Sequence, residues 1–153
     1  MYDVRFIDSD EWEDAMQLAY ETFLKYDAAY FSEEGIKHFR EFVSDSTLKR
    51  MNEAGSFQVI GCYAANLLVG VAAMRNLNHI SLLFIKGEYH RKGIGRRLVN
   101  ELADYAKIKL HQEFLTVHAA PYAYDFYRRL GFKDTDVEQT QDGIKYIPMR
   151  YDL

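Results

Sequence analysis

The stretch from Glu88 to Arg97 places two glycines and four cations at the start of a predicted helix. It follows the apolar run 80–85, which is typical of a strand, and its helix is indicated by apolar residues at helical spacing, Ile94, Leu98, Leu102 and Tyr105. Glycines let the backbone approach a ligand closely, and the free N–H groups of a helix's first turn bind anions. The cations at this end are Arg91, Lys92, Arg96 and Arg97. Because the macrodipole already makes this end positive, the stretch predicts a site for a negatively charged ligand.

Two other phosphate-binding motifs compete for this stretch. A P-loop needs Lys followed by Ser or Thr after its last glycine, whereas Gly95 is followed by two arginines. A dinucleotide-binding fingerprint needs a third small residue where Leu98 stands, and it needs an acidic residue after the next predicted strand, 114–118. The first motif is therefore excluded, and the second is weak.

Length and composition predict one globular domain over residues 1–153. Hydrophobic residues make up 48% of the chain, which is enough for a substantial core. The net charge of -4 argues against nucleic acid as the main partner, because binding to a phosphate backbone relies on a basic face. The single cysteine, Cys62, cannot form an internal disulfide, and neither a secretory signal nor a membrane-spanning apolar run is found. We therefore expect a cytoplasmic protein without a membrane partner.

Hydrophobic periodicity predicts a mixed α/β fold. The first strand is expected at 4–7, and three helices are expected near 10–24, 33–43 and 47–53. Three strands at 57–63, 67–74 and 79–85 should then form an antiparallel meander, and the helix after the glycine stretch should return the chain to a parallel strand at 114–118. A helix from Pro121 to Leu130 and a hairpin across Asp142-Gly143 follow. The expected sheet is mostly antiparallel with one parallel pair, and helices flank both of its faces.

A second motif lies downstream of the glycine stretch and reads Phe126-Tyr127-Arg128-Arg129-Leu130-Gly131-Phe132. It resembles the F-Y-x-x-L-G-F signature of the GCN5-related N-acetyltransferase (GNAT) family. The pattern x-x-x-Gly-x-Gly, which enters a helix directly from a strand, resembles the pyrophosphate loop of the same family. Because both motifs occur in the family's order and at its separation, and the strand order also agrees, the resemblance covers nearly the whole chain.

The resemblance implies transfer of an acetyl group from acetyl-CoA to a primary amine. Direct attack by the amine would form a tetrahedral intermediate and release the coenzyme A thiolate, so the site must stabilise an oxyanion and move protons. Tyr127 matches the general acid of the family. With an ordinary pKa of about 10, it would stay protonated at neutral pH and could donate to the thiolate.

The resemblance also assigns the cofactor contacts. Main-chain groups of Leu83, Phe84 and Ile85 would bind the pantetheine arm. The pyrophosphate would lie on the loop formed by His90, Arg91, Lys92, Gly93, Ile94, Gly95 and Arg96. His90 stands where relatives usually have Gln or Arg, and His118 stands where they often have an Asn that binds the cofactor.

The acceptor side is less well defined. Tyr30 and Phe31 belong to the segment that walls the acceptor pocket in the family, so they are candidate substrate residues. His79, with an ordinary pKa of about 6.5, is the candidate general base. Ser81 lies two residues further on the same predicted strand face and is a candidate substrate contact.

Three functions stay open. The preferred hypothesis is N-acetylation of a small-molecule amine, and the alternatives are the same chemistry on a protein or peptide amine and a non-catalytic acyl-CoA sensor. No metal is expected, because His38 and His111 have no cysteine or carboxylate at ligand spacing. A covalent acetyl-cysteine is also not expected at Cys62. The many aromatic residues favour an apolar self-association patch, so a homodimer is expected.

Overall fold

The computed structural model describes residues 1–153. Its strands are β1 (Tyr2–Phe6), β2 (Phe57–Ala64), β3 (Leu67–Arg75), β4 (His79–Ile85), β5 (Phe114–Ala119), β6 (Lys133–Asp134), β7 (Gln139–Gln141) and β8 (Ile144–Asp152). Its α-helices are α1 (Trp12–Tyr26), α2 (Glu33–Val43), α3 (Ser46–Glu53), α4 (Ile94–Ile108) and α5 (Tyr124–Leu130). Short 3-10 turns at 9–11, 28–30, 87–89 and 121–123 join some of them. None of the helices has the length and apolar character that crossing a membrane requires.

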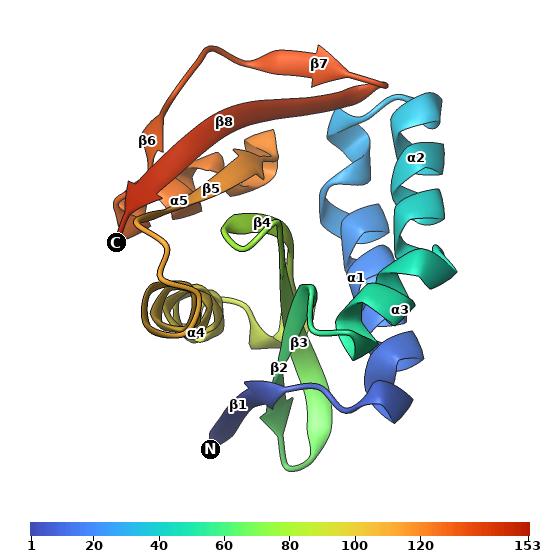
Figure 1. Cartoon of the computed structure of the whole chain (residues 1–153). Helices are drawn as coiled ribbons and strands as arrows, with labels where there is room; N and C mark the ends of the chain where they lie inside the picture. Colours follow the sequence, from blue (N-terminus) through green and yellow to red (C-terminus); the bar gives the residue numbers. More distant parts are fainter.

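The strands form one mixed sheet in the order β1-β2-β3-β4-β5-β8-β6, and β7 pairs with β8. All pairs are antiparallel except β4 with β5. Figure 1 shows α4 on one side of strands β2 to β4 and α1, α2 and α3 on the other side. The expected mixed fold with one parallel pair and helices on both faces is therefore confirmed. The expected helix from Pro121 differs in detail, since its first turn is 3-10 and α5 begins only at Tyr124.

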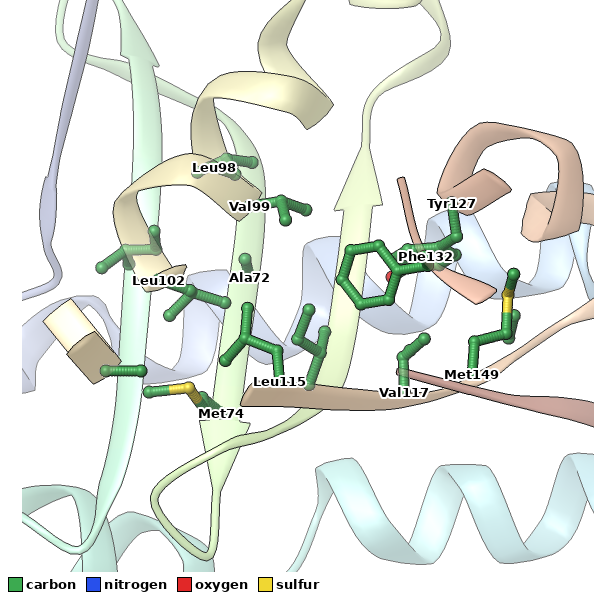
Figure 2. Close-up of a cluster of buried hydrophobic side chains, with 14 of the residues drawn as sticks. Ala72, Met74, Leu98, Val99, Leu102, Leu115, Val117, Tyr127, Phe132 and Met149 are labelled. Carbon is green, nitrogen blue, oxygen red and sulfur yellow. The ribbon is translucent and has the colours of Figure 1, made fainter. Parts of the chain in front are cut away.

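Two hydrophobic cores lie on the two faces of the sheet. The larger one packs Leu98 and Leu102 of α4 and Tyr127 of α5 against Leu115 and Val117 of β5 and other strand residues, as Figure 2 shows. The smaller one packs α1, with Trp12 and Phe23 buried, against the opposite face. The apolar stripes of α1 and α4, which the sequence displays at helical spacing, therefore fix these two helices on opposite faces of the sheet.

A bulge in β4 departs from simple strand alternation. Ala73 pairs with Leu82 and Met74 pairs with Ile80, so Ser81 has no partner on β3. Ile80 consequently belongs to the larger core, while Leu82 belongs to the smaller one, although residues two apart on a regular strand share a face. The extra residue turns the second half of β4 relative to the first. The sequence gives no sign of this bulge, because every residue from Ile80 to Ile85 except Ser81 is apolar.

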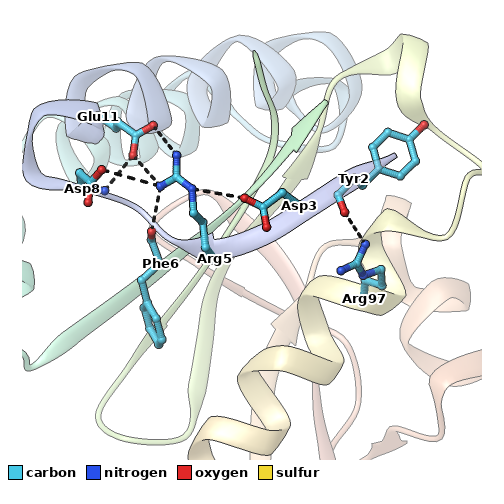
Figure 3. A network of polar contacts seen from close by, with 7 residues as sticks. All are labelled: Tyr2, Asp3, Arg5, Phe6, Asp8, Glu11 and Arg97. Carbon is cyan, nitrogen blue, oxygen red and sulfur yellow. Dashed lines mark hydrogen bonds and ion pairs between the residues drawn. The ribbon is translucent and has the colours of Figure 1, made fainter. Parts of the chain in front are cut away.

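Polar contacts anchor β1, the edge strand of the sheet. The Arg5 guanidinium donates to the Glu11 carboxylate at 3.1 Å, and Glu11 in turn accepts from the Asp8 N–H at 2.8 Å (Figure 3). On the other side, Arg97 of α4 donates to the Tyr2 carbonyl at 3.0 Å (Figure 3). One of the four cations of the glycine stretch therefore serves a structural contact, which leaves three for a ligand.

The turn between β7 and β8 docks on the first turn of α2. Ser32 caps α2 by accepting from the Gly35 N–H at 3.1 Å, and its own N–H donates to the Gly143 carbonyl at 3.1 Å. Gly143 itself is in the left-handed region, with φ of +78°. A β-carbon at Gly35 would collide with the Gly143 carbonyl, so the two backbones approach as closely as they do only because this residue has no side chain.

Gly35→Ala is therefore expected to destabilise the protein, although Ala normally favours a helix over Gly by about 1 kcal/mol. Displacing the docked turn should lower the free energy of unfolding by roughly 1–3 kcal/mol, measured by urea denaturation. Lys37→Ala, at an exposed position of the same helix, is the matched control and should change stability by less than about 0.5 kcal/mol. Equal or greater stability of Gly35→Ala would show that the turn does not depend on this contact.

Candidate active site

Strands β4 and β5 separate soon after they begin to pair. Only His79 with Thr116 and Ile80 with Val117 are in register, and β4 then continues to Ile85 with β3 along one edge and no strand along the other. Half of the main-chain N–H and C=O groups of residues 81–85 therefore face an open edge. Unpaired strand edges bind extended ligands through main-chain hydrogen bonds.

A cavity of about 980 Å³ lies at this opening. Its walls include Leu83, Phe84 and Ile85 of β4, most of the glycine stretch, Tyr26 and Asp27 at the end of α1, and Phe126 and Leu130 of α5. The cavity therefore brings together two sequence motifs that are about thirty residues apart. Of the predicted cofactor residues, Lys92, His118 and Tyr127 do not line this cavity.

The glycine stretch forms a cradle of free N–H groups. Gly93 caps α4 with φ of +80°, and the first bond of the helix runs from the Arg97 N–H to the Gly93 carbonyl. The N–H groups of residues 91–96 donate to no backbone carbonyl. Arg91 also has a positive φ, +61°, which is a strained conformation for a residue with a side chain. The loop thus presents several donors at the positive end of a fifteen-residue helix.

The cations around the cradle form no ion pairs within the protein. Arg91, Arg96 and Arg129 line the first cavity, and none of them forms an ion pair. Lys92 is exposed beside them. An excess of unpaired positive charge around free N–H groups suits a ligand with more than one negative charge, such as a pyrophosphate.

His90 does not point a free nitrogen into the cradle. Its Nε2 lies 2.6 Å from the Ile85 carbonyl, so this nitrogen carries the proton and donates. Its ring also packs against Tyr26, with ring centroids 4.8 Å apart. The side chain therefore ties the loop to the end of β4, and it leaves only Nδ1 to face a ligand.

Tyr127 is buried beside the first cavity. Its ring packs edge-to-face with Phe132 at a centroid distance of 5.1 Å (Figure 2). It packs in the same way with Phe126 at 5.2 Å. Burial, and then the nearby Asp27 carboxyl, raise the pKa of Tyr127 well above its usual range. The hydroxyl makes no hydrogen bond, and it is not fully enclosed by protein atoms. The phenol is therefore a protonated, uncommitted donor.

A second cavity, of about 420 Å³, lies on the other side of Phe84 and Asp27, which line both cavities. Its walls come from α2, from β4 and β5, and from the docked turn with the start of β8. Phe31, His79, Ser81 and His118 line it, whereas Tyr30 is 43% exposed and lies outside it. The structure thus brings together most of the predicted acceptor residues, but not Tyr30.

His79 is held at the point where β4 and β5 separate. Its Nδ1 is 2.8 Å from the Thr116 hydroxyl, and its ring meets His118 edge-on at 4.8 Å. Burial, and then the charges of His118 and Arg75, lower the pKa of His79 to about 4. The pKa of His79 therefore lies below the ordinary histidine value of about 6.5. At neutral pH the ring is uncharged, and it is a weak base.

His118 lies on the acceptor side rather than on the cofactor side. Leu115, Val117 and Ala119 of β5 point into the larger core, so strand alternation sends His118 to the opposite face. There its ring stacks on Tyr146 with centroids 4.2 Å apart. The predicted cofactor contact of His118 thus has no support from its position.

Asp27 is a functional candidate that the sequence analysis missed. The residue is 9% exposed, it lines both cavities, and its carboxyl forms no hydrogen bond or ion pair. Burial raises the pKa of Asp27 to about 7. A carboxyl group poised near neutral pH between two cavities, close to a phenol, is the arrangement that acid-base chemistry requires. A single aspartate after a helix carries no motif, so only tertiary packing reveals it.

Gly95→Val is expected to weaken binding of acetyl-CoA at least tenfold, which is about 1.4 kcal/mol. A β-carbon at Gly95 would stand 3.0 Å from two ring atoms of Phe126, so it would force that ring or the loop to move. Calorimetric titration measures the affinity, and Asn100→Val, an exposed position of the same helix, controls for the β-branched residue. Unchanged affinity of a folded Gly95→Val protein would exclude the cradle as the cofactor site.

The fold and the two motifs at this site are those of a known family of enzymes. The family model of the acetyltransferase (GNAT) domain matches residues 27–153, and the chain belongs to this family of N-acetyltransferases. An uncharacterized N-acetyltransferase of Methanocaldococcus jannaschii is 25% identical over 148 residues, which cover 89% of this chain and 62% of that protein. The chain therefore spans less than two thirds of the length of this relative.

Solved structures agree with the fold. A GCN5-related N-acetyltransferase from Rhodopseudomonas palustris has a TM-score of 0.83 at 18% identity, over 99% of this chain and 95% of its own. The PaiA N-acetyltransferase of Thermoplasma acidophilum, in complex with coenzyme A, has a TM-score of 0.79 at 22% identity, over 100% and 99%. A spermidine N-acetyltransferase variant from Vibrio cholerae has a TM-score of 0.68 at 16% identity, over 99% and 93%.

Proposed function

We propose that this chain transfers the acetyl group of acetyl-CoA to a primary amine of a small molecule, and that the amine attacks the thioester directly. The observation that carries the proposal is the opening between β4 and β5. The first cavity, with its cradle of free N–H groups, lies at this opening, and it shares a wall with the second cavity. Membership of the GNAT family and the coenzyme A complex of PaiA support the choice of cofactor.

The residues of the first cavity suit acetyl-CoA. The free N–H groups of residues 91–96 and the unpaired Arg91 and Arg96 would hold the pyrophosphate. The open edge of β4 at Leu83, Phe84 and Ile85 would hold the pantetheine arm by main-chain hydrogen bonds. When bound there, acetyl-CoA supplies an activated acyl group as a thioester.

Tyr127 would donate the proton that the departing thiolate needs. Its hydroxyl has no competing hydrogen-bond partner, and its raised pKa keeps it protonated over the whole neutral range. A protonated group that lies behind the cavity wall beside Phe126 could act as a general acid toward a thiolate in the first cavity.

Asp27 is the better candidate for the general base. Its carboxyl has a pKa of about 7, whereas the His79 ring has a pKa of about 4, and a base works best when its pKa lies near the working pH. The Asp27 carboxylate can also attract the ammonium form of the amine before it accepts a proton. His79, fixed by Thr116, would then orient the acceptor rather than deprotonate it.

A small acceptor is favoured over a protein or peptide amine. The second cavity is walled by α2, by the sheet and by the docked turn, and a volume of about 420 Å³ is the size of a small-molecule pocket. The spermidine N-acetyltransferase among the fold neighbours acts on an amine of this size class. Homodimerisation and a cytoplasmic location stay predictions.

A panel of amines tests the proposal. The wild-type protein and acetyl-CoA should release one free thiol for each acetylated small amine, with the product identified by its mass. Lysine-containing peptides and intact proteins serve as the competing acceptors. Acetylation of peptides at a rate equal to or above that of every small amine would replace the proposed acceptor class with the protein alternative.

A further inference from the structure

Arg75 is an unpaired cation inside the second cavity. It is the last residue of β3, it pairs with His79 across the hairpin, and it lines the second cavity but not the first. Its Nε is fully enclosed and has no hydrogen-bond partner, and the guanidinium forms no ion pair. An enclosed charged donor without a partner costs free energy, so this group is expected to meet an acceptor that the chain does not supply.

The side chains packed around Arg75 offer it no negative charge. His79 and His118 are its titratable neighbours on β4 and β5, and Arg75 helps to lower the pKa of both. Both rings are therefore uncharged at neutral pH and offer no counter-charge. Tyr146 of β8 donates its hydroxyl to Gln139 at 3.2 Å and forms no hydrogen bond with Arg75.

A carboxyl group lies at the wall that the two cavities share. Asp27 lines that wall, and it too has no partner within the chain. The second cavity thus presents an unpaired carboxyl next to the reaction centre and an unpaired guanidinium on a wall that the first cavity does not share. A molecule with an amine and an anionic group could pair with both.

Other charged side chains at the second cavity affect a bound ligand less than Asp27 and Arg75 do. Asp142 and His38 line the mouth and, with Glu34, could draw a polycation there. All three are exposed, however, so water and salt screen them, and Lys145 lines the same mouth with the opposite charge. Arg75 is partly buried and its Nε is fully enclosed, so its charge is screened less and has the larger effect on a bound ligand.

We propose that the acceptor is an amine that also carries a carboxylate or a phosphate, and that Arg75 binds this anionic group while the amine lies beside Asp27. The proposal rests on the proposed function and narrows its substrate class. A guanidinium offers two parallel N–H donors, which match the oxygens of either anion. The same charge disfavours a linear polyamine, because its second ammonium group would face Arg75.

The test compares acceptors that differ only in the group at the far end. The wild-type protein is assayed with ω-aminocarboxylates of two to five methylene groups, the matching ω-aminoalkylphosphonates, alkylamines and α,ω-diaminoalkanes. At the best length, kcat/KM for an anionic amine should exceed that of the alkylamine and the diamine at least tenfold. The ratio between the carboxylate and the phosphonate series shows which anion the site takes.

Variants of Arg75 separate binding from folding. Arg75→Gln should raise KM for anionic amines at least tenfold, with kcat and the values for alkylamines within about twofold of wild type. Arg75→Lys keeps the charge but loses the two parallel N–H donors, so its KM for anionic amines should lie between those of wild type and Arg75→Gln. Lys107→Gln, on the exposed side of α4, should behave as wild type. Melting curves establish whether the variants are folded. If Arg75→Gln does not fold, Arg75→Lys alone suffices for the test.

Two outcomes would overturn the proposal. If diamines are the best acceptors and Arg75→Gln changes nothing, the amine acetyltransferase stands and the anionic acceptor is wrong. If no amine is acetylated, wild type and Arg75→Gln are titrated with the aminocarboxylates and aminophosphonates in the presence of coenzyme A, which shows whether binding needs Arg75. Binding that needs Arg75 would support the anion site without the proposed function, and binding that ignores Arg75 would reject it.

Discussion

Tyr127→Phe is expected to lower kcat about 100-fold, the lower end of what a positioned general acid contributes. The change removes only the hydroxyl, which has no hydrogen-bond partner, and leaves the ring between Phe126 and Phe132. The affinity for acetyl-CoA should therefore hardly change, and the free energy of unfolding should stay within about 1 kcal/mol of wild type. Steady-state kinetics, calorimetry and urea denaturation measure the three quantities.

Tyr124→Phe is the matched control for this experiment. The Tyr124 hydroxyl donates to the Asp134 carboxylate at 2.9 Å and lies outside the first cavity, so its loss should leave kcat within about twofold. Normal turnover of Tyr127→Phe would make Tyr127 a packing residue and would leave thiolate departure to another donor. Equal losses in both variants would point to a disturbed α5 instead of a lost acid.

Asp27→Asn is expected to have an effect of similar size on kcat/KM, a loss of about 100-fold at neutral pH, because an amide cannot accept the proton. In the wild type, kcat/KM should rise with pH and level off above about 7, where the Asp27 carboxyl becomes ionised. The variant should lose this part of the pH profile. Retention of the same profile would assign it to the amine or to another base, with His79 the first alternative.

The same substitution should stabilise the protein, and the sign follows from the raised pKa. The folded state binds the Asp27 proton up to a pH of about 7, while the unfolded state releases it near pH 3.8, so wild-type stability declines as pH rises between these values. Asp27→Asn removes this loss. At pH 8 the gain should be on the order of 2 kcal/mol, since the open cavity keeps part of the charge hydrated, and near pH 4 it should be small.

Asp104→Asn, an exposed position of α4, controls for the change from carboxylate to amide and should show no gain at either pH. A stable but inactive Asp27→Asn protein would be the expected trade of stability for function. A destabilised variant would instead mean that the carboxylate makes a favourable contact that the protein needs for folding.

The regular elements follow from local features of the sequence, and most were predicted. The cap at Ser32, the left-handed turn at Gly131 and the helical spacing of Leu98 and Leu102 each act over a few residues. The parallel return to β5 follows from the handedness of crossovers. The two short motifs also indicated the cavity that is proposed to bind the cofactor, because glycines and cations at a helix start favour an anionic ligand.

The acceptor side depended on contacts that no local pattern reveals. The bulge at Ser81 and the separation of β4 from β5 decide which side chains meet, and they place His118 with His79 rather than with the cofactor loop. Burial then shifts the pKa of His79 downwards and that of Asp27 upwards. The sequence shows both residues but not their surroundings, so it favoured the histidine as the base.

The most direct test of direct transfer to an amine is the joint measurement of thiol release and acetylated product, at varied concentrations of acetyl-CoA and of an accepted amine. The account predicts one thiol per acetylated amine, intersecting double-reciprocal lines and no acetyl group on the protein by mass spectrometry. Parallel lines with an acetylated protein intermediate would contradict it. Tight binding of acetyl-CoA without release of thiol to any amine would also contradict it, and it would make the chain a sensor instead of an enzyme.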